Sequence, residues 1–313
     1  MSGRDRVDPE ARAALDARLA AVPGGFQAIG DIVARRAAIE EMTSTSQAPP
    51  NPRIHSQDHT IPATPEVLVR VYRPAGTSET LPGIYCIHGG GMVQGNIDGD
   101  RATASLLCEQ INAVVVSVRY RLAPEHPYPA AVEDCYTGLT WMVDNAAELG
   151  LDPRRVAVYG ASAGGGLTIA TALLARDRGG PPISFMMPIY PMIDDRHETA
   201  SSREITDLGS WDRDTSIQAW TWYLGGRPAD GYAAPARAED LTGLPPAFID
   251  VGTVDLFRDE DITFAQRLMA AGVPTELHVH PGSYHGAESL APDSALARRT
   301  WQLRLDALRR ALA

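Results

Sequence analysis

The chain has 313 residues, of which 44% are hydrophobic and 21% charged, so it can form an ordinary globular protein with a large core. A formal net charge of -11 disfavours nucleic acid and bare membrane as partners, because both carry dense negative charge. All of its cationic residues are arginines, which excludes every mechanism that needs a lysine, including Schiff-base chemistry.

The first residues contain no apolar stretch typical of a secretion signal, and no apolar run approaches the roughly 18 residues of a membrane span. The three cysteines, Cys86, Cys108 and Cys135, lie inside apolar segments. An odd number of cysteines without a signal peptide is typical of reduced core thiols. The sequence therefore predicts a cytoplasmic protein.

The first 52 residues differ in pattern from the rest of the chain. Asp8 and Pro9 are typical of a helix start, and apolar residues follow at helical spacing. A second helix is predicted over 27–42. The polar, proline-rich segment 43–52 is predicted to be a linker, because it cannot continue a helix.

Beyond the linker, short apolar strands alternate with longer helical segments. The predicted strands are 67–73, 83–87, 113–120, 155–159, 183–190, 247–251 and 275–280, and the predicted helices are 130–149, 163–177, 259–271 and 292–312. This alternation indicates an α/β fold with a mostly parallel sheet covered by helices on both faces. In such sheets the ligand site lies beyond the carboxyl ends of the strands.

A long insertion separates the strand ending at residue 190 from the strand starting at residue 247. It contains a helix rich in aromatic residues, including Trp211, Trp220, Trp222 and Tyr223. This composition suits a lid over a site, and it equally suits a packed surface subdomain.

The strongest chemical motif is Gly160-Ala161-Ser162-Ala163-Gly164, which follows a predicted strand and opens a predicted helix. A turn this sharp needs small residues and raises the serine hydroxyl above the sheet. Ser162 is therefore the candidate nucleophile, and Gly160 and Gly164 are the residues that permit the turn. The alternative is a glycine-rich turn with an idle serine; neither common phosphate-loop motif is present.

A second motif, His88-Gly89-Gly90-Gly91, ends the predicted strand 83–87. Acyl transfer needs exposed N–H groups directed at an oxygen that becomes negative, and glycines leave backbone amides unobstructed. The predicted donors are Gly90, Gly91 and Ala163. His88 is interpreted as a structural residue that holds the loop, rather than as a base. A plain flexible glycine loop remains the alternative.

Four histidines follow Ser162, namely His197, His278, His280 and His285. His285 lies beyond the last predicted strand, at the edge where parallel strands place their ligands, and is the candidate base. His278 and His280 share one strand face, which permits a two-ligand metal site, but no third ligand has suitable spacing. No metal or cofactor is therefore predicted.

The candidate acid is Asp255, which comes just after the predicted strand 247–251. Its expected task is to fix the tautomer of the histidine and stabilise its charged form. Asp250 lies inside that strand. Asp259, Glu260 and Asp261 begin the next helix, where capping and the helix dipole account for acidic residues.

With these residues in place, the chain resembles the hormone-sensitive-lipase-like family of microbial carboxylesterases (bacterial family IV) from about Ile61 to its end. The resemblance rests on several motifs together: HGGG at 88–91, YRLAPEHPYPA at 120–130, GASAG at 160–164, YP at 190–191, LPPA at 244–247 and DLFRDE at 255–260. It implies a cap made of the N-terminal helices, residues 1–52 with their linker, and an insertion at about 194–230. Residues 53–313 would form the α/β-hydrolase domain.

The resemblance also implies hydrolysis of short-acyl esters without a cofactor, and often a homodimer. Two positions depart from the family pattern. The family usually has an acidic residue or threonine where this chain has Ala161, and its histidine motif is richer in aromatic residues than segment 283–287. Neither departure alters a catalytic group, although each bears on the acyl-chain preference.

The sequence therefore predicts a serine carboxylesterase whose partners are a small ester and water. Within the enzymes, an amidase or lactonase could use the same residues. Outside the enzymes, a ligand-binding receptor without catalysis is the alternative, because a fold does not determine function.

Overall fold

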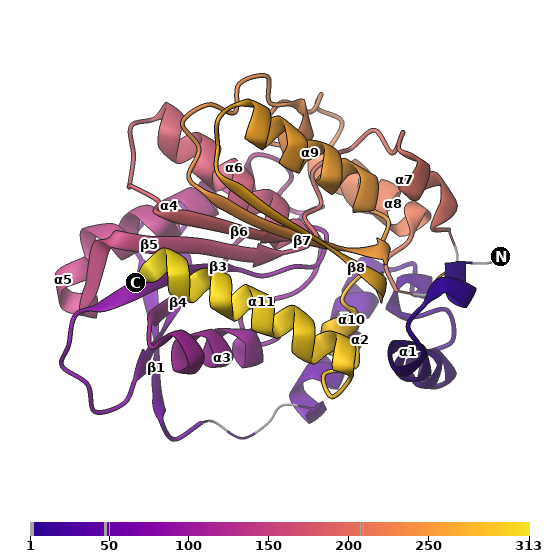
Figure 1. Ribbon diagram of the computed structural model, residues 1–313, viewed down its shortest axis with the longest axis horizontal. Helices are drawn as coiled ribbons and strands as arrows, with labels where there is room; N and C mark the ends of the chain where they lie inside the picture. Colours follow the sequence, from indigo (N-terminus) through magenta and orange to yellow (C-terminus); the bar gives the residue numbers. More distant parts are fainter. Residues whose placement is uncertain (1–2, 47–48, 50, 207, 209) are drawn as a thin grey trace.

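The computed structural model describes residues 3–46, 49, 51–206, 208 and 210–313. Its centre is one sheet with the strand order β1-β2-β4-β3-β5-β6-β7-β8 (Figure 1). The strands are β1 (Ile54–Ile61), β2 (Val67–Pro74), β3 (Leu81–Ile87), β4 (Val114–Arg119), β5 (Leu151–Ala161), β6 (Phe185–Ile189), β7 (Ala247–Val254) and β8 (Thr275–Tyr284). Strands β3 to β8 pair in parallel, whereas β1 and β2 are antiparallel to their neighbours. The predicted fold class is confirmed.

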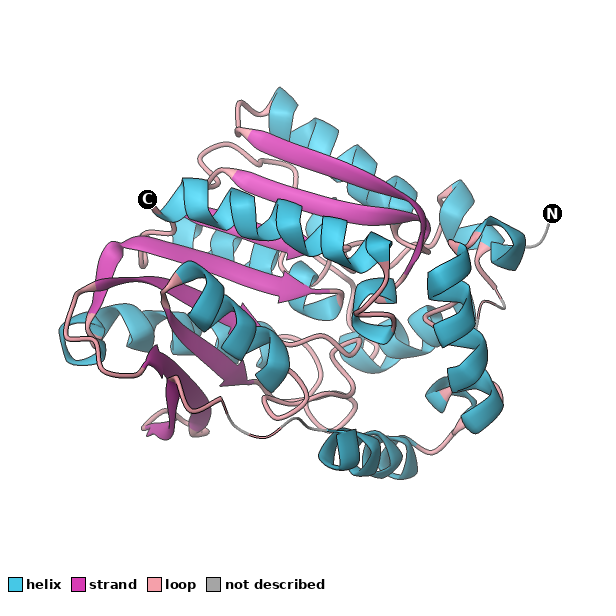
Figure 2. Cartoon of the chain, turned by 60° about the horizontal axis from the view of Figure 1, so that its bottom comes forward, coloured by secondary structure: helices cyan, strands magenta, loops and turns pink. Residues whose placement is uncertain are grey.

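Helices cover both faces of the sheet. The longer ones are α1 (Pro9–Ala21), α2 (Ile32–Ser46), α3 (Arg101–Ile111), α4 (Ala130–Asp144), α6 (Ala163–Asp177), α8 (Arg213–Leu224), α9 (Arg258–Ala270) and α11 (Ala295–Leu312). The short ones are α5 (Ala146–Leu149), α7 (Ala200–Glu204) and α10 (Ala287–Leu290). Helices α3 and α11 lie on one face and α4, α6 and α9 on the other, while α1, α2, α7 and α8 gather near the carboxyl ends of the parallel strands (Figures 1 and 2).

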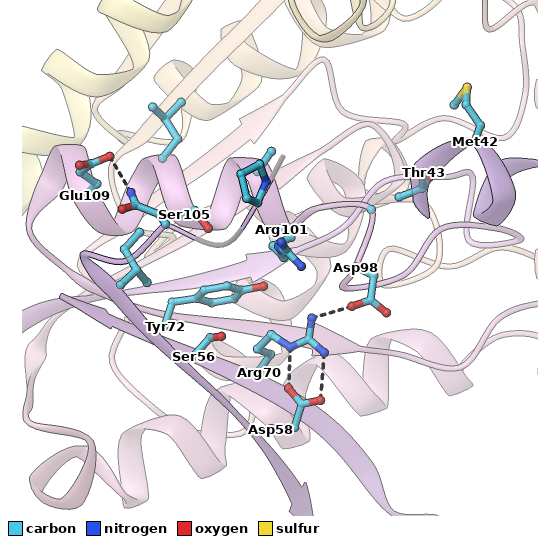
Figure 3. Close-up of a pocket in the computed structure, with 16 residues that line it drawn as sticks. Met42, Thr43, Ser56, Asp58, Arg70, Tyr72, Asp98, Arg101, Ser105 and Glu109 are labelled. Atoms are coloured by element: carbon cyan, nitrogen blue, oxygen red, sulfur yellow. Dashed lines mark hydrogen bonds and ion pairs between the residues drawn. The ribbon is translucent and has the colours of Figure 1, made fainter. Parts of the chain in front are cut away.

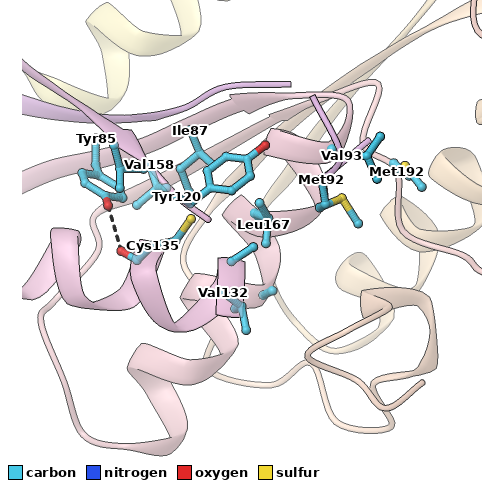
Figure 4. Packing of buried hydrophobic residues seen from close by; sticks show 14 of the residues in the cluster. Tyr85, Ile87, Met92, Val93, Tyr120, Val132, Cys135, Val158, Leu167 and Met192 are labelled. Carbon is cyan, nitrogen blue, oxygen red and sulfur yellow. Dashed lines mark hydrogen bonds between the residues drawn. The ribbon is translucent and has the colours of Figure 1, made fainter. Parts of the chain in front are cut away.

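Each face of the sheet has its own apolar core. On the side of α4 and α6, Tyr85 and Val158 from the sheet pack with Val132 and Leu167 from the helices (Figure 4). Full burial of side chains of this size typically contributes about 1.5–3 kcal/mol each. The Tyr85 hydroxyl also donates to the carbonyl of Cys135 at 2.9 Å, so its polar end is satisfied inside the core.

The three cysteines are buried free thiols, as predicted. Burial raises the pKa of Cys108 to about 12 and the pKa values of Cys86 and Cys135 well above their ordinary value. Because a thiolate is the reactive form, these residues are chemically quiet. Within the described part of the chain, no helix is both long and apolar enough to cross a membrane.

Several elements were not predicted from the sequence, among them the short helices α7 and α10, strand β1 and helix α3. Strand β1 is an edge strand whose side chains are mostly exposed, so it lacks the apolar pattern of a buried strand. Helix α3 packs Ala104, Leu107 and Cys108 against the sheet, but its remaining residues are mixed. Neither segment has a clear pattern of its own, and both are defined by contact with β2 and β4.

The predicted helix 27–42 is shifted in the structure, and the linker is shorter than expected. Asp31 caps the helix by accepting a hydrogen bond from Ala34 N at 2.7 Å, so the helix starts after it. At the other end, Ser44 and Thr45 donate their hydroxyls to the carbonyls of Glu41 and Met42, both at 2.9 Å. These bonds satisfy the hydroxyls within the helix, which continues to residue 46. Residues 47, 48 and 50 of the predicted linker lie outside the described residues.

Candidate active site

Ser162 stands in the tight turn between β5 and α6, as the motif predicts. Its backbone has φ 59° and ψ -121°, a conformation that is costly for a residue with a side chain. The flanking glycines are required for steric reasons. A Cβ on Gly160 would lie 2.2 Å from the carbonyl oxygen of Gly164, and one on Gly164 would lie 2.0 Å from that of Ile87. The turn is therefore strained, and it can form only because residues 160 and 164 have no side chain beyond a hydrogen atom.

The structure brings Ser162, Asp255 and His285 together from the carboxyl ends of β5, β7 and β8. The Nε2 atom of His285 lies 2.8 Å from Ser162 Oγ, and its Nδ1 atom lies 2.9 Å from Asp255 Oδ2. An ionised Asp255 can only accept, so Nδ1 carries the proton and Nε2 is left to accept the serine hydroxyl. This geometry can transfer a proton from Ser162 to His285.

Asp255 is fully buried and directly follows β7, while His285 directly follows β8. Strand β8 is four residues longer than the predicted strand 275–280. His285 therefore follows the end of a strand directly and is not separated from it by a loop. Asp255 Oδ1 also accepts a hydrogen bond from Phe257 N at 3.0 Å. Both carboxylate oxygens of Asp255 thus accept a hydrogen bond, and this fixes the orientation of its side chain.

Aromatic rings surround His285, and the sequence did not predict these contacts. The rings of Tyr190 and Phe257 meet it edge to face, with centroids 4.7 Å and 5.2 Å away, and Trp211 lies 6.3 Å away. Ser210 Oγ donates to the carbonyl of His285 at 2.7 Å. The insertion was recognisable by its tryptophans, but nothing in its sequence shows which of them reaches the histidine.

The glycines of the HGGG motif lie directly beside Ser162. A Cβ on Gly89 would be 2.9 Å from the carbonyl oxygen of Ala161 and 3.5 Å from Ser162 Cβ. Gly90 and Gly91 have φ values of 117° and 65°, which favour glycine. Within the described residues, their N–H groups have no hydrogen-bond acceptor. Ala163 is the first residue of α6, where a helix leaves its own N–H groups unpaired.

His88 is buried inside the fold and does not reach Ser162. Its Nδ1–H donates to the carbonyl of Gly89 at 2.8 Å, and its ring stacks on Tyr120 at 4.1 Å. The Tyr120 hydroxyl in turn donates to the His88 carbonyl at 2.9 Å. Burial lowers the pKa of His88 to about 4, so the ring is neutral at physiological pH. These contacts fit a residue that holds the glycine loop.

His278 and His280 stack on each other, 6.3 Å apart, on the outer strand β8. Each has a carboxylate partner: Glu276 at 2.8 Å from His278 and Asp250 at 3.4 Å from His280. Among the described residues, no group of three or more His, Cys, Asp or Glu side chains could hold a metal ion.

A buried network of charged side chains is connected to His285 through Tyr190. Arg304 on α11 is 1% exposed and binds both oxygens of Asp250 at 2.7 and 3.0 Å and Glu288 at 2.8 Å. Burial would raise the pKa of Asp250, but the charge of Arg304 holds it below its ordinary value. Glu288 also accepts the Tyr190 hydroxyl at 2.7 Å. The final helix thereby supports the ring that packs against His285.

The sequence interpretation of the acidic residues after β7 is wrong in part. Glu260 and Asp261 lie in the first turn of α9, but they are buried rather than exposed at a helix end. Glu260 accepts hydrogen bonds from the N–H groups of Ile193 and Asp194, both at 3.3 Å. Within the described residues, both oxygens of Asp261 have no hydrogen-bond partner. Burial and the nearby Glu260, Asp255 and Asp250 carboxylates raise the pKa of Asp261 well above its ordinary value.

We expect Asp261→Asn to become more stable relative to the wild type as the pH rises from 4 to 8. A raised folded-state pKa means that the folded chain keeps a proton that the unfolded chain releases. The stability from this group is therefore present below the unfolded pKa and lost as the pH rises, by at most about 1.4 kcal/mol per pH unit. Thermal unfolding across this range measures the difference. Asp214→Asn, at an exposed site, is the control, and parallel curves for wild type and Asp261→Asn would contradict the expectation.

A cavity of about 940 Å³ lies away from these residues, between β1, β2, α3 and the end of α2 (Figure 3). Its lining includes none of Ser162, His285 and Asp255. Arg70 in its wall is held by Asp58 at 2.5 and 2.9 Å and by Asp98 at 2.6 Å. Two carboxylates therefore already balance the charge of Arg70.

Comparisons with known proteins agree with this geometry. A profile of the alpha/beta hydrolase fold matches residues 84–289. Carboxylesterase NlhH of Mycobacterium tuberculosis is 37% identical over 99% of this chain and 97% of its own. Among solved structures, a bacterial heroin esterase has a TM-score of 0.92 at 36% identity, with complete coverage of both chains. A thermostable esterase from Pseudomonas putida has a TM-score of 0.91 at 29% identity, covering 98% of each chain.

The chain is thus an alpha/beta hydrolase and a carboxylic ester hydrolase. It belongs to the hormone-sensitive-lipase-like carboxylesterases, the bacterial family IV of this fold, as its motifs suggest.

Proposed function

We propose that the chain hydrolyses small, short-acyl carboxylic esters through an acyl-enzyme on Ser162. The observation that carries this proposal is the continuous hydrogen-bonded series from Ser162 Oγ through His285 to the buried Asp255, with contacts of 2.8 and 2.9 Å. A nucleophile, a base and an orienting acid are in contact before any substrate arrives.

In the first half of the reaction, Ser162 Oγ attacks the ester carbonyl while His285 Nε2 takes its proton. The tetrahedral intermediate then collapses, and His285 gives that proton to the leaving alkoxide, which departs as the alcohol. In the second half, a water molecule gives a proton to His285 and attacks the acyl-enzyme. The carboxylic acid is released, and His285 returns the proton to Ser162. Asp255 stays ionised throughout and stabilises the charged imidazole.

The developing oxyanion would be held by the N–H groups of Gly90, Gly91 and Ala163. This assignment is supported by the position of the glycine loop against Ser162 and by the unpaired N–H groups described above. Such donors act before the reaction starts, because the backbone already orients them.

We further propose that residues 1–52 and the insertion at about 194–230 form a cap over a catalytic domain of residues 53–313. The two segments are joined by Arg35 of α2, which donates to Gln218 of α8 at 2.9 Å. Over the glycine loop, a Cβ on Gly91 would lie 2.4 Å from Trp211 Cη2. Together with Tyr190 and Phe257 beside His285, this crowding supports a small acyl pocket.

A chain-length series of p-nitrophenyl esters tests the substrate class, and matched p-nitroanilides test the bond type. We expect kcat/KM to be highest for acetyl to butyryl esters. By octanoyl it should fall by about 10-fold or more, which corresponds to about 1.4 kcal/mol of lost transition-state binding. The anilides should be cleaved more slowly than the esters. A maximum at octanoyl or longer would contradict the small pocket, and faster anilide cleavage would indicate an amidase.

A further inference from the structure

Arg36 on α2 makes four hydrogen bonds to two loops of the hydrolase domain, one of which continues from the glycine motif. Its Nε donates to the carbonyl of Val93 and its Nη2 to that of Ala123, both at 2.7 Å. The same guanidinium binds the two carboxylate oxygens of Glu125 at 2.8 and 2.9 Å. One side chain from the N-terminal segment therefore connects two separate loops of the hydrolase domain.

The turn that Arg36 holds is the one that contains Gly90 and Gly91. The Gly90 carbonyl accepts hydrogen bonds from Val93 N at 3.1 Å and Gln94 N at 3.0 Å, which closes the turn. The Met92 carbonyl accepts from Ala123 N at 2.9 Å. The Val93 carbonyl is bound by Arg36, so that side chain completes the connection of the turn to its surroundings.

We infer that Arg36 is a positioning residue for hydrolysis, which holds the N–H groups of Gly90 and Gly91 in place for the oxyanion. This inference rests on the proposed function, because it assumes that those N–H groups bind the oxyanion. It extends that function in one respect. The N-terminal segment does not only cover the site; through Arg36 it also sets the geometry of the catalytic machinery.

The chemistry of the contact favours arginine. A guanidinium is planar, carries five donors in a fixed arrangement and remains charged at all relevant pH values. It can bind two carbonyls and a carboxylate in one plane. A lysine has one ammonium on a flexible stem and cannot reproduce all four bonds. Arg36 lowers the pKa of Glu125, and the ion pair between them keeps the guanidinium in the orientation that reaches both carbonyls.

Arg35 is a matched control, since it lies next to Arg36 on the same helix and has the same charge. Its Nε donates to the carbonyl of Ile29 at 2.8 Å and its Nη2 to Gln218 at 2.9 Å, and its guanidinium lies over the Trp222 ring. The first contact holds the segment just before α2, and the other two join α2 to α8, so these three contacts lie away from the glycine turn. Arg35→Met therefore loosens the proposed cap without removing support from Gly90 and Gly91.

The experiment compares Arg36→Met, Arg36→Lys and Arg35→Met in the full-length protein, with p-nitrophenyl acetate as substrate. For Arg36→Met we expect kcat to fall by about 10- to 100-fold with KM nearly unchanged, as for misplaced catalytic groups. Inhibition by an aryl trifluoromethyl ketone, whose serine adduct carries an oxyanion, should weaken by a similar factor. Arg36→Lys should lie in between. For Arg35→Met we expect KM to rise while kcat stays near wild type, and ketone binding should weaken only by the factor by which KM rises.

Chemical rescue distinguishes positioning from general damage. Methylguanidine at millimolar concentration should restore part of kcat in Arg36→Ala, and it should leave kcat unchanged in Arg35→Ala, where kcat is expected to be near wild type already. Circular dichroism and end-point labelling by a fluorophosphonate give the folded and active fractions. The inference is overturned if folded Arg36→Met keeps wild-type kcat, whether or not its KM rises. Failure of the wild-type protein to label at Ser162 would instead overturn the proposed function.

Discussion

Ser162→Ala is expected to lower kcat for ester hydrolysis by roughly a million-fold, the loss typical of removing the nucleophile from this kind of machinery. Without Oγ there is no acyl-enzyme, and His285 has no proton to accept. The remaining rate comes from the oxyanion donors and substrate binding alone. Steady-state kinetics with p-nitrophenyl acetate measure the loss. Mass spectrometry after fluorophosphonate treatment should find the label on Ser162 in the wild type and on no serine in the variant.

The chain offers a matched control for this substitution. Ser216 on α8 lies 2.9 Å from His197 Nε2, which gives it a serine–histidine contact much like that of Ser162. Ser216 is fully buried, however, and the Nδ1 atom of His197 faces the carbonyl of Asp195 rather than a carboxylate. We expect Ser216→Ala to affect turnover only as far as it affects stability. Retained turnover in Ser162→Ala, or labelling of Ser216, would refute the assignment of the nucleophile.

Asp255→Asn is expected to reduce kcat by about ten-thousand-fold while leaving the fold intact. An asparagine can still accept the hydrogen bond from Phe257 N, so local structure should survive. Its amide group can donate to Nδ1, and this would favour the histidine tautomer with the proton on Nε2. That tautomer cannot accept the proton of Ser162.

Circular dichroism and steady-state kinetics of Asp255→Asn test both parts of this expectation. His280→Ala and His285→Ala provide the comparison, because each histidine contacts a buried aspartate on or just after β7. We expect His285→Ala to be inactive and His280→Ala to change activity little beyond any loss of stability. The reverse result would mean that the base had been placed on the wrong histidine.

The sequence was most informative where local geometry restricts the choice of residue. Ser162 needs glycines on both sides of its turn, so the motif predicts the strand, the turn and the helix together. Asp255 and His285 could be found because strands that run in parallel bring their carboxyl ends to one edge. The three side chains do lie in hydrogen-bond contact, and their catalytic roles remain predictions.

Features that depend on tertiary contacts could not be read from the sequence. Nothing near Trp211 indicates that its ring lies over Gly91, and nothing near Arg36 indicates that it binds Val93. Asp261 was assigned to helix capping because its position in the chain fits that role, although its burial depends on how α9 packs. In each case the partner is far away in sequence, so no local pattern reports it.

The order of Arg304 and the active-site residues along the chain has a consequence for protein synthesis. A ribosome makes Ser162, Asp255 and His285 before it makes Arg304, which is the cation that Asp250 and Glu288 share. Until that residue emerges, Asp250 and Glu288 lack the guanidinium that binds them both, and the partner of the Tyr190 hydroxyl is not held in place. We expect the nascent chain to stay inactive until α11 has docked, so that synthesis of the catalytic residues alone does not yield an active hydrolase.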